Sequence, residues 1–116
     1  APEKKQQCQK PWLSIFFLTF NKDYKCGEIS TNKLKIKINN KHVMCKSNNK
    51  DRYNRFIAEC FKDKININKW MISNGYAVAY RKYSKKFISQ ENLAKKEKLG
   101  IWVGTFEMPW EWRKKN

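Results

Sequence analysis

The sequence predicts an α+β fold made of an antiparallel hairpin and about three helices. Two short apolar segments flank a run of turn-forming residues near the middle of the chain, and stretches typical of helices lie on both sides of that pair. Of the 116 residues, 41% are hydrophobic, which is enough for one modest core. We therefore expect a single domain over residues 1–116.

The hairpin is expected from the segments 41–46 (KHVMCK) and 55–61 (RFIAECF). Both are short and apolar, and the SNNKDRYN stretch between them is rich in turn formers. Cys45 and Cys60 stand symmetrically about this loop, so antiparallel pairing places them opposite each other, at a separation that suits a disulfide. Two strands alone make a poor sheet, and the sequence offers no clear further strand to complete it.

The cysteines indicate disulfides rather than a metal site. None of the four forms a Cys-x-x-Cys pair and His42 is the single histidine, so close zinc ligands are missing. With Cys45 paired to Cys60, a Cys8–Cys26 disulfide follows by elimination, and two disulfides favour an oxidising compartment. The alternative is four buried free thiols in a cytosolic protein.

The helices are expected at 26–41, 66–75 and 89–100. In 66–75, Asn66 or Asn68 can cap the start and Gly75 can end the helix. In 89–100, Glu91 supplies early negative charge, and lysines and a glycine follow at the end.

The remaining segments are expected to have no helix. Residues 76–83 (YAVAYRKY) are interpreted as extended. The aromatic and basic tail, residues 105–116, should pack back onto the domain, and Pro109 is expected to prevent a helix there.

The longest apolar run, WLSIFFLTF, extends from Trp12 to Phe20 within a predicted insertion at residues 9–23. It is too short to span a bilayer. Three interpretations stay open: a buried strand, a packed insertion, or a surface that binds a partner.

The charge balance indicates an anionic partner. The chain carries 26 Lys and Arg against 10 Asp and Glu, a net charge of +16. Such an excess on a small domain suits nucleic acid, an acidic polysaccharide or an anionic membrane, and the aromatic residues favour nucleic acid. The alternative is a solvated lysine-rich surface produced by biased composition.

Four collinear motifs point further: DRYNRFIAEC, INKWMISNGYAVAY, AKKEKLGIW and PWEWR. Together they resemble the thermonuclease (staphylococcal nuclease-like) family, in its secreted, cysteine-containing bacterial branch, over roughly residues 24–113. The resemblance implies the C-terminal part of an OB-fold barrel. Asn54 replaces the glycine of the family's Tyr-Gly-Arg motif, and asparagine tolerates the left-handed backbone that such a position needs.

The opening Ala1-Pro2-Glu3 resembles the end of the family's Asp-(Ala/Thr)-Pro-Glu motif. On that resemblance, the first three barrel strands would precede Ala1. The alternative is cleavage by signal peptidase immediately before Ala1. The resemblance to the secreted branch implies a secreted or periplasmic bacterial protein, which we expect to be a monomer.

The resemblance implies calcium-assisted hydrolysis of DNA or RNA. Glu3 matches the carboxylate that positions or deprotonates the attacking water, and Arg55 matches the arginine that contacts the scissile phosphate. A guanidinium can bind two phosphate oxygens as negative charge grows on them, and a carboxylate can activate water. Further substrate contacts are expected from Arg52, Tyr53, Tyr80 and Tyr83.

The family's metal-binding aspartates and its second arginine belong to the strands before Ala1, so Ala1 offers calcium a backbone carbonyl at most. We therefore expect this polypeptide alone to be inactive and the full-length protein to be a nuclease. The alternative is a nuclease-like module that holds nucleic acid without cutting it. A third reading is a protein that binds acidic polymers or partner proteins.

Other ionisable residues are interpreted structurally. Asp51 should organise the hairpin turn. His42 is no candidate general base. Glu107 and Glu111 are expected to pair locally with Arg113 and the neighbouring lysines.

Overall fold

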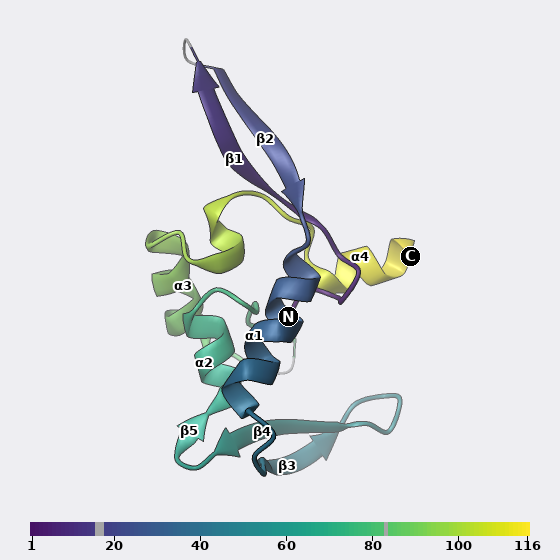
Figure 1. Ribbon diagram of the computed structural model, residues 1–116. Coiled ribbons are helices and arrows are strands. Elements are labelled where there is room, and N and C mark those ends of the chain that lie inside the picture. Colours follow the sequence, from purple (N-terminus) through teal and green to yellow (C-terminus); the bar gives the residue numbers. More distant parts are fainter. Residues whose placement is uncertain (16–17, 83) are drawn as a thin grey trace.

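The structure is a computed structural model. It describes residues 1–15, 18–82 and 84–116, and it includes the side chains of all of these except residues 13–15. Figure 1 shows a central group of helices with one hairpin projecting from each end. No helix in these described ranges is long and apolar enough to cross a membrane.

The expected helices form, with shifts at their ends. Helix α1 is Cys26–Ile38, α2 is Ile67–Ser73 and α3 is Ile88–Lys96. The Asn66 side chain caps α2 by accepting a hydrogen bond from the backbone of Lys69, because the first backbone N–H groups of a helix lack partners inside it.

The central hairpin forms in the predicted register. Strands β3 (Met44–Lys50) and β4 (Phe56–Lys62) pair antiparallel with Cys45 opposite Cys60, and β5 (Ile65–Asn66) extends the sheet. Strands β1 (Cys8–Ile15) and β2 (Leu18–Tyr24) form a second, separate antiparallel pair. Within the described ranges the fold is α+β and these small sheets do not close into a barrel.

The Trp12–Phe20 run forms part of the β1–β2 hairpin, which projects from the body (Figure 1). Its described side chains at Trp12, Leu18 and Phe20 are exposed. The interpretation as a buried strand is therefore wrong, because the hairpin extends beyond the core instead of crossing it. Residues 16–17 of this run lie outside the described residues.

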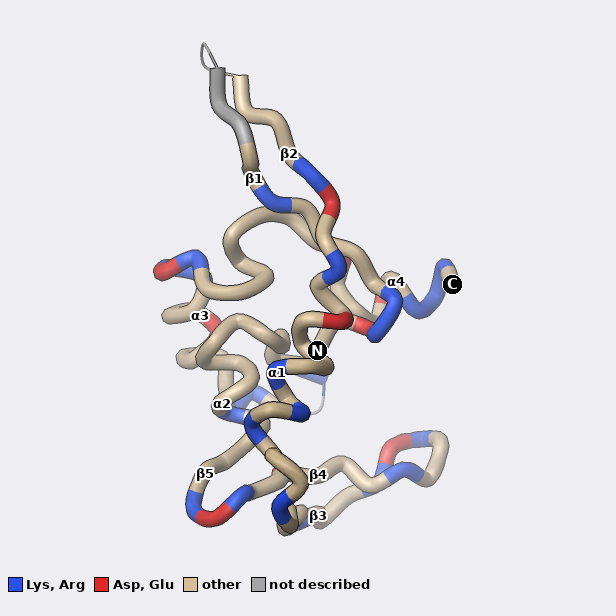
Figure 2. The backbone as a smooth tube through the Cα atoms, in the orientation of Figure 1, with Lys and Arg blue, Asp and Glu red and all other residues tan. Residues whose placement is uncertain are grey.

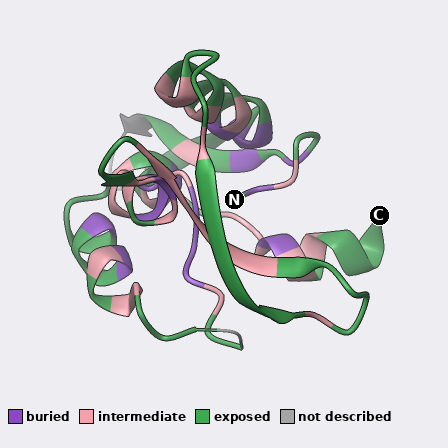
Figure 3. Cartoon of the chain, turned by 90° about the horizontal axis from the view of Figure 1, so that it is seen from below, coloured by how far each residue is buried: buried purple, intermediate pink, exposed green. Residues whose placement is uncertain are grey.

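The core consists of two clusters on either side of the segment that follows α2. Ala77 and Ala79 pack with α2, whereas Val78 packs with the Cys8–Cys26 disulfide and Ile101. Extended backbone sends successive side chains to opposite sides, so one short segment joins both clusters. Figure 3 shows buried positions on the helices and on the segments that join them, whereas β3 is exposed along its whole length and most of β4 is intermediate.

The tail forms helix α4, Pro109–Lys115, after a single 3-10 turn, η1, at Gly100–Val103. The expectation that Pro109 prevents a helix here is wrong. Proline occupies the first helical turn, where its missing N–H would have had no partner and its fixed φ angle already suits a helix.

Two disulfides form, Cys8–Cys26 and Cys45–Cys60, which are the two pairs predicted from the sequence. The first joins the start of β1 to the start of α1 and is almost fully buried. It therefore fixes the N-terminal segment to the helical core.

Replacing both Cys8 and Cys26 with alanine is expected to lower the free energy of unfolding by about 3 kcal/mol, because the disulfide closes a loop of 18-residue separation. Urea unfolding under non-reducing conditions measures the change. The matched variant has alanine in place of both Cys45 and Cys60, whose disulfide closes a loop of 15-residue separation. Equal stability of the first variant and the parent chain would contradict the prediction.

Candidate active site

The turn between β3 and β4 is organised by Asp51. Its carboxylate accepts hydrogen bonds from the backbone N–H groups of Tyr53 (2.8 Å) and Arg55 (3.0 Å). It also accepts one from Arg55 Nε at 2.7 Å. These bonds, with the backbone bond from Arg55 foremost, hold the pKa of Asp51 below its usual value. The sequence interpretation of Asp51 as a turn organiser agrees with these contacts.

The same turn places two guanidinium groups close to the ring of Tyr53. The Arg52 and Arg55 groups lie 4.9 and 5.2 Å from the centre of the Tyr53 ring. Asn54 has a φ of 64°, the left-handed conformation expected where the family has glycine. Two cations and an aromatic face are thus displayed on an exposed loop.

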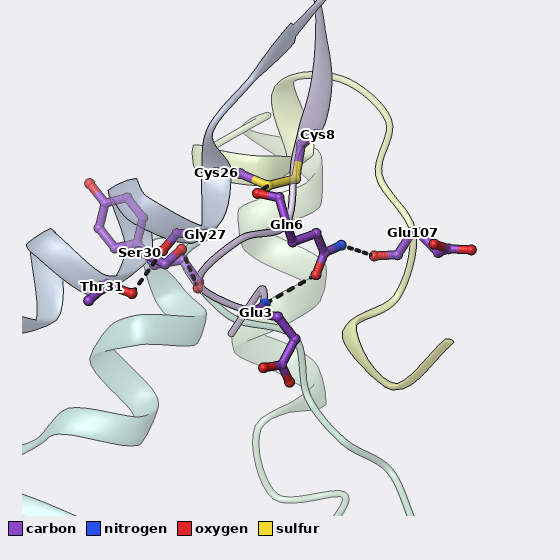
Figure 4. Close-up of a disulfide and its surroundings, with 9 residues drawn as sticks. Glu3, Gln6, Cys8, Cys26, Gly27, Ser30, Thr31 and Glu107 are labelled. Atoms are coloured by element: carbon purple, nitrogen blue, oxygen red, sulfur yellow. Dashed lines mark hydrogen bonds between the residues drawn. A yellow bond between two sulfur atoms is a disulfide. The ribbon is translucent and has the colours of Figure 1, made fainter. Parts of the chain in front are cut away.

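Glu3 is held by its backbone and by one ion pair. Its N–H donates to Gln6 Oε1 (3.1 Å), and its carbonyl accepts from the Gln6 N–H (2.8 Å). The buried Gln6 amide also donates to the Glu107 carbonyl, which ties this segment to the chain before α4 (Figure 4). The Glu3 carboxylate lies 3.1 Å from Arg113 Nε.

Gly27 allows the Glu3 segment to lie directly on α1. A Cβ at position 27 would stand 1.8 Å from the Glu3 carbonyl oxygen. The Gly27 N–H also donates to the Gln6 carbonyl at 3.1 Å. A larger residue would therefore displace the segment that carries Glu3.

A cavity of about 380 Å³ lies between the β3–β4 turn and α4. The described residues that line it are cationic and aromatic, and none of them is a carboxylate: Arg52, Tyr53, Arg55, Tyr80, Lys82, Trp110, Arg113 and Lys114. Glu3 does not line this cavity, but its partner Arg113 does. Figure 2 shows the basic residues of α4 and of the β3–β4 turn on the same side of the molecule.

The structure thus brings together four residues that the resemblance singled out: Arg52, Tyr53, Arg55 and Tyr80 all line the cavity. Tyr83 lies outside the described residues. Ala1 is exposed and lies two positions before Glu3 in the same segment.

Sequence reasoning missed the contribution of α4. Trp110 stacks on Tyr80 with ring centres 4.8 Å apart, and this contact fixes α4 against the cavity. Arg113 then pairs with Glu3 rather than with a neighbouring glutamate, so the expected local pairing is wrong for Arg113. It is correct for the lysines, since Lys114 pairs with Glu111 and Lys115 with Glu107. The PWEWR motif was the available signal for α4 in the sequence. It could not show what α4 contacts, because Tyr80 and Glu3 are remote from it in sequence.

Calcium does not fit the described residues taken alone. Calcium takes six to eight oxygen ligands. Among the described side chains, no three of His, Cys, Asp or Glu cluster in a way that could hold a metal, and the cavity beside Glu3 is lined by cations.

The cavity has the chemistry to bind a polyanion that carries aromatic bases. Arginine forks and lysines suit phosphate oxygens, and tyrosine and tryptophan faces suit stacked bases. A carboxylate at the edge of such a cavity can orient a water molecule toward a bound phosphate.

Comparison with known proteins decides the family. The family model described as "Staphylococcal nuclease homologue" matches residues 1–104. The chain belongs to the staphylococcal nuclease family. The resemblance found in the sequence is confirmed at this level, while its finer assignment to a secreted, cysteine-containing branch stays a prediction.

Three relatives are identical to this chain at about a third of the aligned residues. An uncharacterized endonuclease of Escherichia coli O157:H7 is 30% identical over 117 residues, covering 97% of this chain and 65% of the relative. An uncharacterized endonuclease of Haemophilus influenzae is 35% identical over 92 residues, covering 76% and 51%. The succinoglycan biosynthesis protein ExoI of Rhizobium meliloti is 34% identical over 83 residues, covering 69% and 44%. The chain therefore spans about half the length of these relatives.

Proposed function

We propose that this staphylococcal nuclease-family chain belongs to a phosphodiesterase that hydrolyses DNA or RNA. The observation that carries the proposal is the cavity in which Arg55, Arg52 and Tyr53 from the β3–β4 turn meet Tyr80 and Arg113, with Glu3 paired to Arg113 at its edge. The names of two relatives as endonucleases support the same class of reaction.

Arg55 is the proposed ligand of the scissile phosphate. In the structure one nitrogen of its guanidinium pairs with Asp51, and the group is well exposed, so its remaining N–H donors can reach a phosphate. Those donors stabilise the negative charge that grows on the phosphate oxygens during attack by water. Asp51 fixes the direction of the group.

Glu3 is the proposed general base. Its carboxylate accepts the proton of the attacking water, and the water oxygen forms a bond to phosphorus as the leaving oxygen departs. Arg113 Nε lies 3.1 Å from the Glu3 carboxylate and holds it at the edge of the cavity. Gln6 and Gly27 position the backbone of Glu3.

The aromatic residues are the proposed base contacts. Tyr53 and the stacked Tyr80–Trp110 pair line the cavity, and stacking on aromatic rings tolerates any base. Family membership supports calcium as the cofactor of the whole protein, with ligands additional to the residues described here. We also propose a secreted or periplasmic location, which the two disulfides support, and a monomer.

A second candidate function is a nuclease-like module that binds nucleic acid without cutting it. The observation that favours it is the cavity lining, which is basic and aromatic and holds no carboxylate. A binding module needs only that lining, whereas an enzyme also needs Glu3.

The experiment that separates the two candidates measures cleavage and binding of a labelled oligonucleotide by the whole protein, with calcium and with EDTA. We expect calcium-dependent cleavage that Glu3→Gln removes while binding is retained, because the amide keeps the shape of the carboxylate but cannot take a proton. Glu28→Gln, an exposed change on α1, is the matched control. Tight binding without cleavage by the unchanged protein would favour the binding module.

A further inference from the structure

The β1–β2 hairpin projects beyond the rest of the molecule (Figure 1). It is anchored at its base, where Gln9 and Thr105 exchange backbone hydrogen bonds of 2.8 and 3.0 Å and the Cys8–Cys26 disulfide fixes the start of β1. Among the residues between Cys8 and Tyr24 whose side chains are described, none belongs to either core cluster. The proposed nuclease function uses none of these outer residues.

The outer half of the hairpin exposes large apolar side chains. Trp12 is 59% exposed, Leu18 63% and Phe20 47%. Leu18 and Phe20 share one face of β2, because side chains alternate along a strand, and the register places Ile15 and Leu13 opposite them. Exposed apolar residues gathered in this way mark a surface that binds something.

Lysines border this apolar end. Lys22 follows Phe20 on the same face of β2 and is paired with Lys10 across the hairpin. A hollow near the base is lined by three lysines together with two glutamines and a glutamate: Lys4, Lys5, Lys25, Gln6, Gln7 and Glu28. Figure 2 shows the outer part of β2 free of charge and the first charged residues closer to the body. The sequence from Gln9 to Lys22 contains no Asp or Glu.

We propose that the β1–β2 hairpin docks this protein on an anionic phospholipid bilayer. Trp12, Leu18 and Phe20 enter the boundary between head groups and acyl chains, and Lys10 and Lys22 contact the anionic head groups above them. Tryptophan suits this boundary, and each lysine near an anionic surface adds attraction. The net charge of +16 draws the whole chain toward the same surface.

Two physical arguments favour an anionic bilayer over a second copy of the chain, and the bilayer interface over its hydrocarbon interior. A second copy of the chain would bring Lys10 and Lys22 of each hairpin together and would add two bodies of charge +16, so self-association is opposed by charge. A hairpin of two strands also leaves backbone N–H and C=O groups unpaired along both outer edges. Those groups need water or head groups, which limits the hairpin to the interface and keeps it out of the hydrocarbon interior.

Docking through the β1–β2 hairpin leaves the cavity between the β3–β4 turn and α4 accessible. In Figure 1 strands β1 and β2 and the β3–β4 sheet lie at opposite ends of the molecule. The bound protein would therefore hold its basic and aromatic cavity away from the lipid.

The experiment is co-sedimentation of the 116-residue chain with vesicles of phosphatidylglycerol and phosphatidylcholine, and with vesicles of phosphatidylcholine alone. We expect binding to the anionic vesicles. The double change Leu18→Ser with Phe20→Ser should weaken it at least about tenfold, because two exposed apolar side chains are removed. Lys10→Gln with Lys22→Gln should weaken it by about fivefold for each lysine.

The matched controls remove equivalent side chains elsewhere. Ile36→Ser with Leu93→Ser deletes two exposed apolar residues from α1 and α3, and Lys33→Gln with Lys64→Gln deletes two exposed lysines. Both control variants should bind the vesicles nearly as well as the parent chain, apart from a small loss from the lower net charge.

A second measurement tests insertion itself. Brominated acyl chains should quench a part of the tryptophan fluorescence that is absent in Trp12→Phe, since bromine quenches only at contact. Vesicle binding with no such difference would mean adsorption through the basic body and would overturn the proposal. So would equal binding by the Leu18/Phe20 variant, no binding to anionic vesicles, or a dimer that this variant abolishes.

Discussion

Replacing Arg55 with alanine is expected to lower the turnover number for phosphodiester cleavage by the whole protein about 10²- to 10³-fold. Removal of one preorganised donor to a developing oxyanion has effects of this size. The turn itself should persist in the variant, because Asp51 still accepts hydrogen bonds from the backbone of Tyr53 and of residue 55. The loss would therefore report on the guanidinium rather than on unfolding.

The kinetics of two further variants sharpen this test. Arg55→Lys keeps the charge but loses the planar fork, so it should recover only part of the turnover. Lys64→Ala removes an exposed cation at the β4–β5 turn, outside the cavity, and should leave turnover unchanged. If Arg55→Ala cleaved as fast as the parent protein, the role assigned to Arg55 would be wrong.

Replacing Glu91 with alanine is expected to lower the free energy of unfolding by about 3 kcal/mol. The Glu91 carboxylate on α3 is fully buried and accepts hydrogen bonds from the backbone N–H of Ala79 (2.9 Å) and from Arg81. Lys95 lies 3.6 Å away. Arg81 and Lys95 are partly exposed and can return to water, but the buried N–H of Ala79 would lose the carboxylate that accepts its hydrogen bond.

Urea unfolding measures this cost. Glu97→Ala, on an exposed residue at the end of the same helix, is the control and should change stability by less than about 0.5 kcal/mol. Glu91→Gln can still accept the bond from Ala79 and should lie between the two. A Glu91→Ala chain as stable as the control would contradict the assignment of Glu91 as a structural anchor.

The pH dependence of Glu91 has a definite sign. Burial acts to raise the pKa of this carboxyl, but Arg81, the Ala79 N–H and Lys95 outweigh it, and the pKa falls below the ordinary value of 4.5. The carboxylate therefore stabilises the fold above that pH, and the stabilisation is lost as the pH falls through the lowered value. The parent chain should lose stability below pH 4.5 more steeply than Glu91→Gln.

The sequence predicted the parts of this molecule that depend on local pattern. The symmetric positions of Cys45 and Cys60 specified the register of β3 and β4, because opposed residues in a hairpin lie at equal distances from its turn. Asn66 and Gly75 likewise marked the ends of α2, since capping and left-handed backbone are local requirements.

Other parts depend on contacts between distant segments and were not predictable in this way. The WLSIFFLTF run carries no Gly, Pro, Asn or Asp, so nothing in it marks the change of direction between β1 and β2. The pairing of Glu3 with Arg113 depends on where α4 docks, which the stacking of Trp110 on Tyr80 decides. Pro109 was misjudged because its effect depends on whether a helix begins or continues there.

The hydrogen bond from Gln6 to the Glu107 carbonyl joins residues 101 positions apart. Contacts of such long range form late in folding, because nearly the whole chain must be ordered first. A chain still emerging from a ribosome or a translocation pore cannot hold Glu3 against Arg113 until α4 has been made and has docked. The proposed general base would thus be held in place only after α4 has docked, so a nascent chain would lack cutting activity while it is still close to the nucleic acids of the cell that makes it.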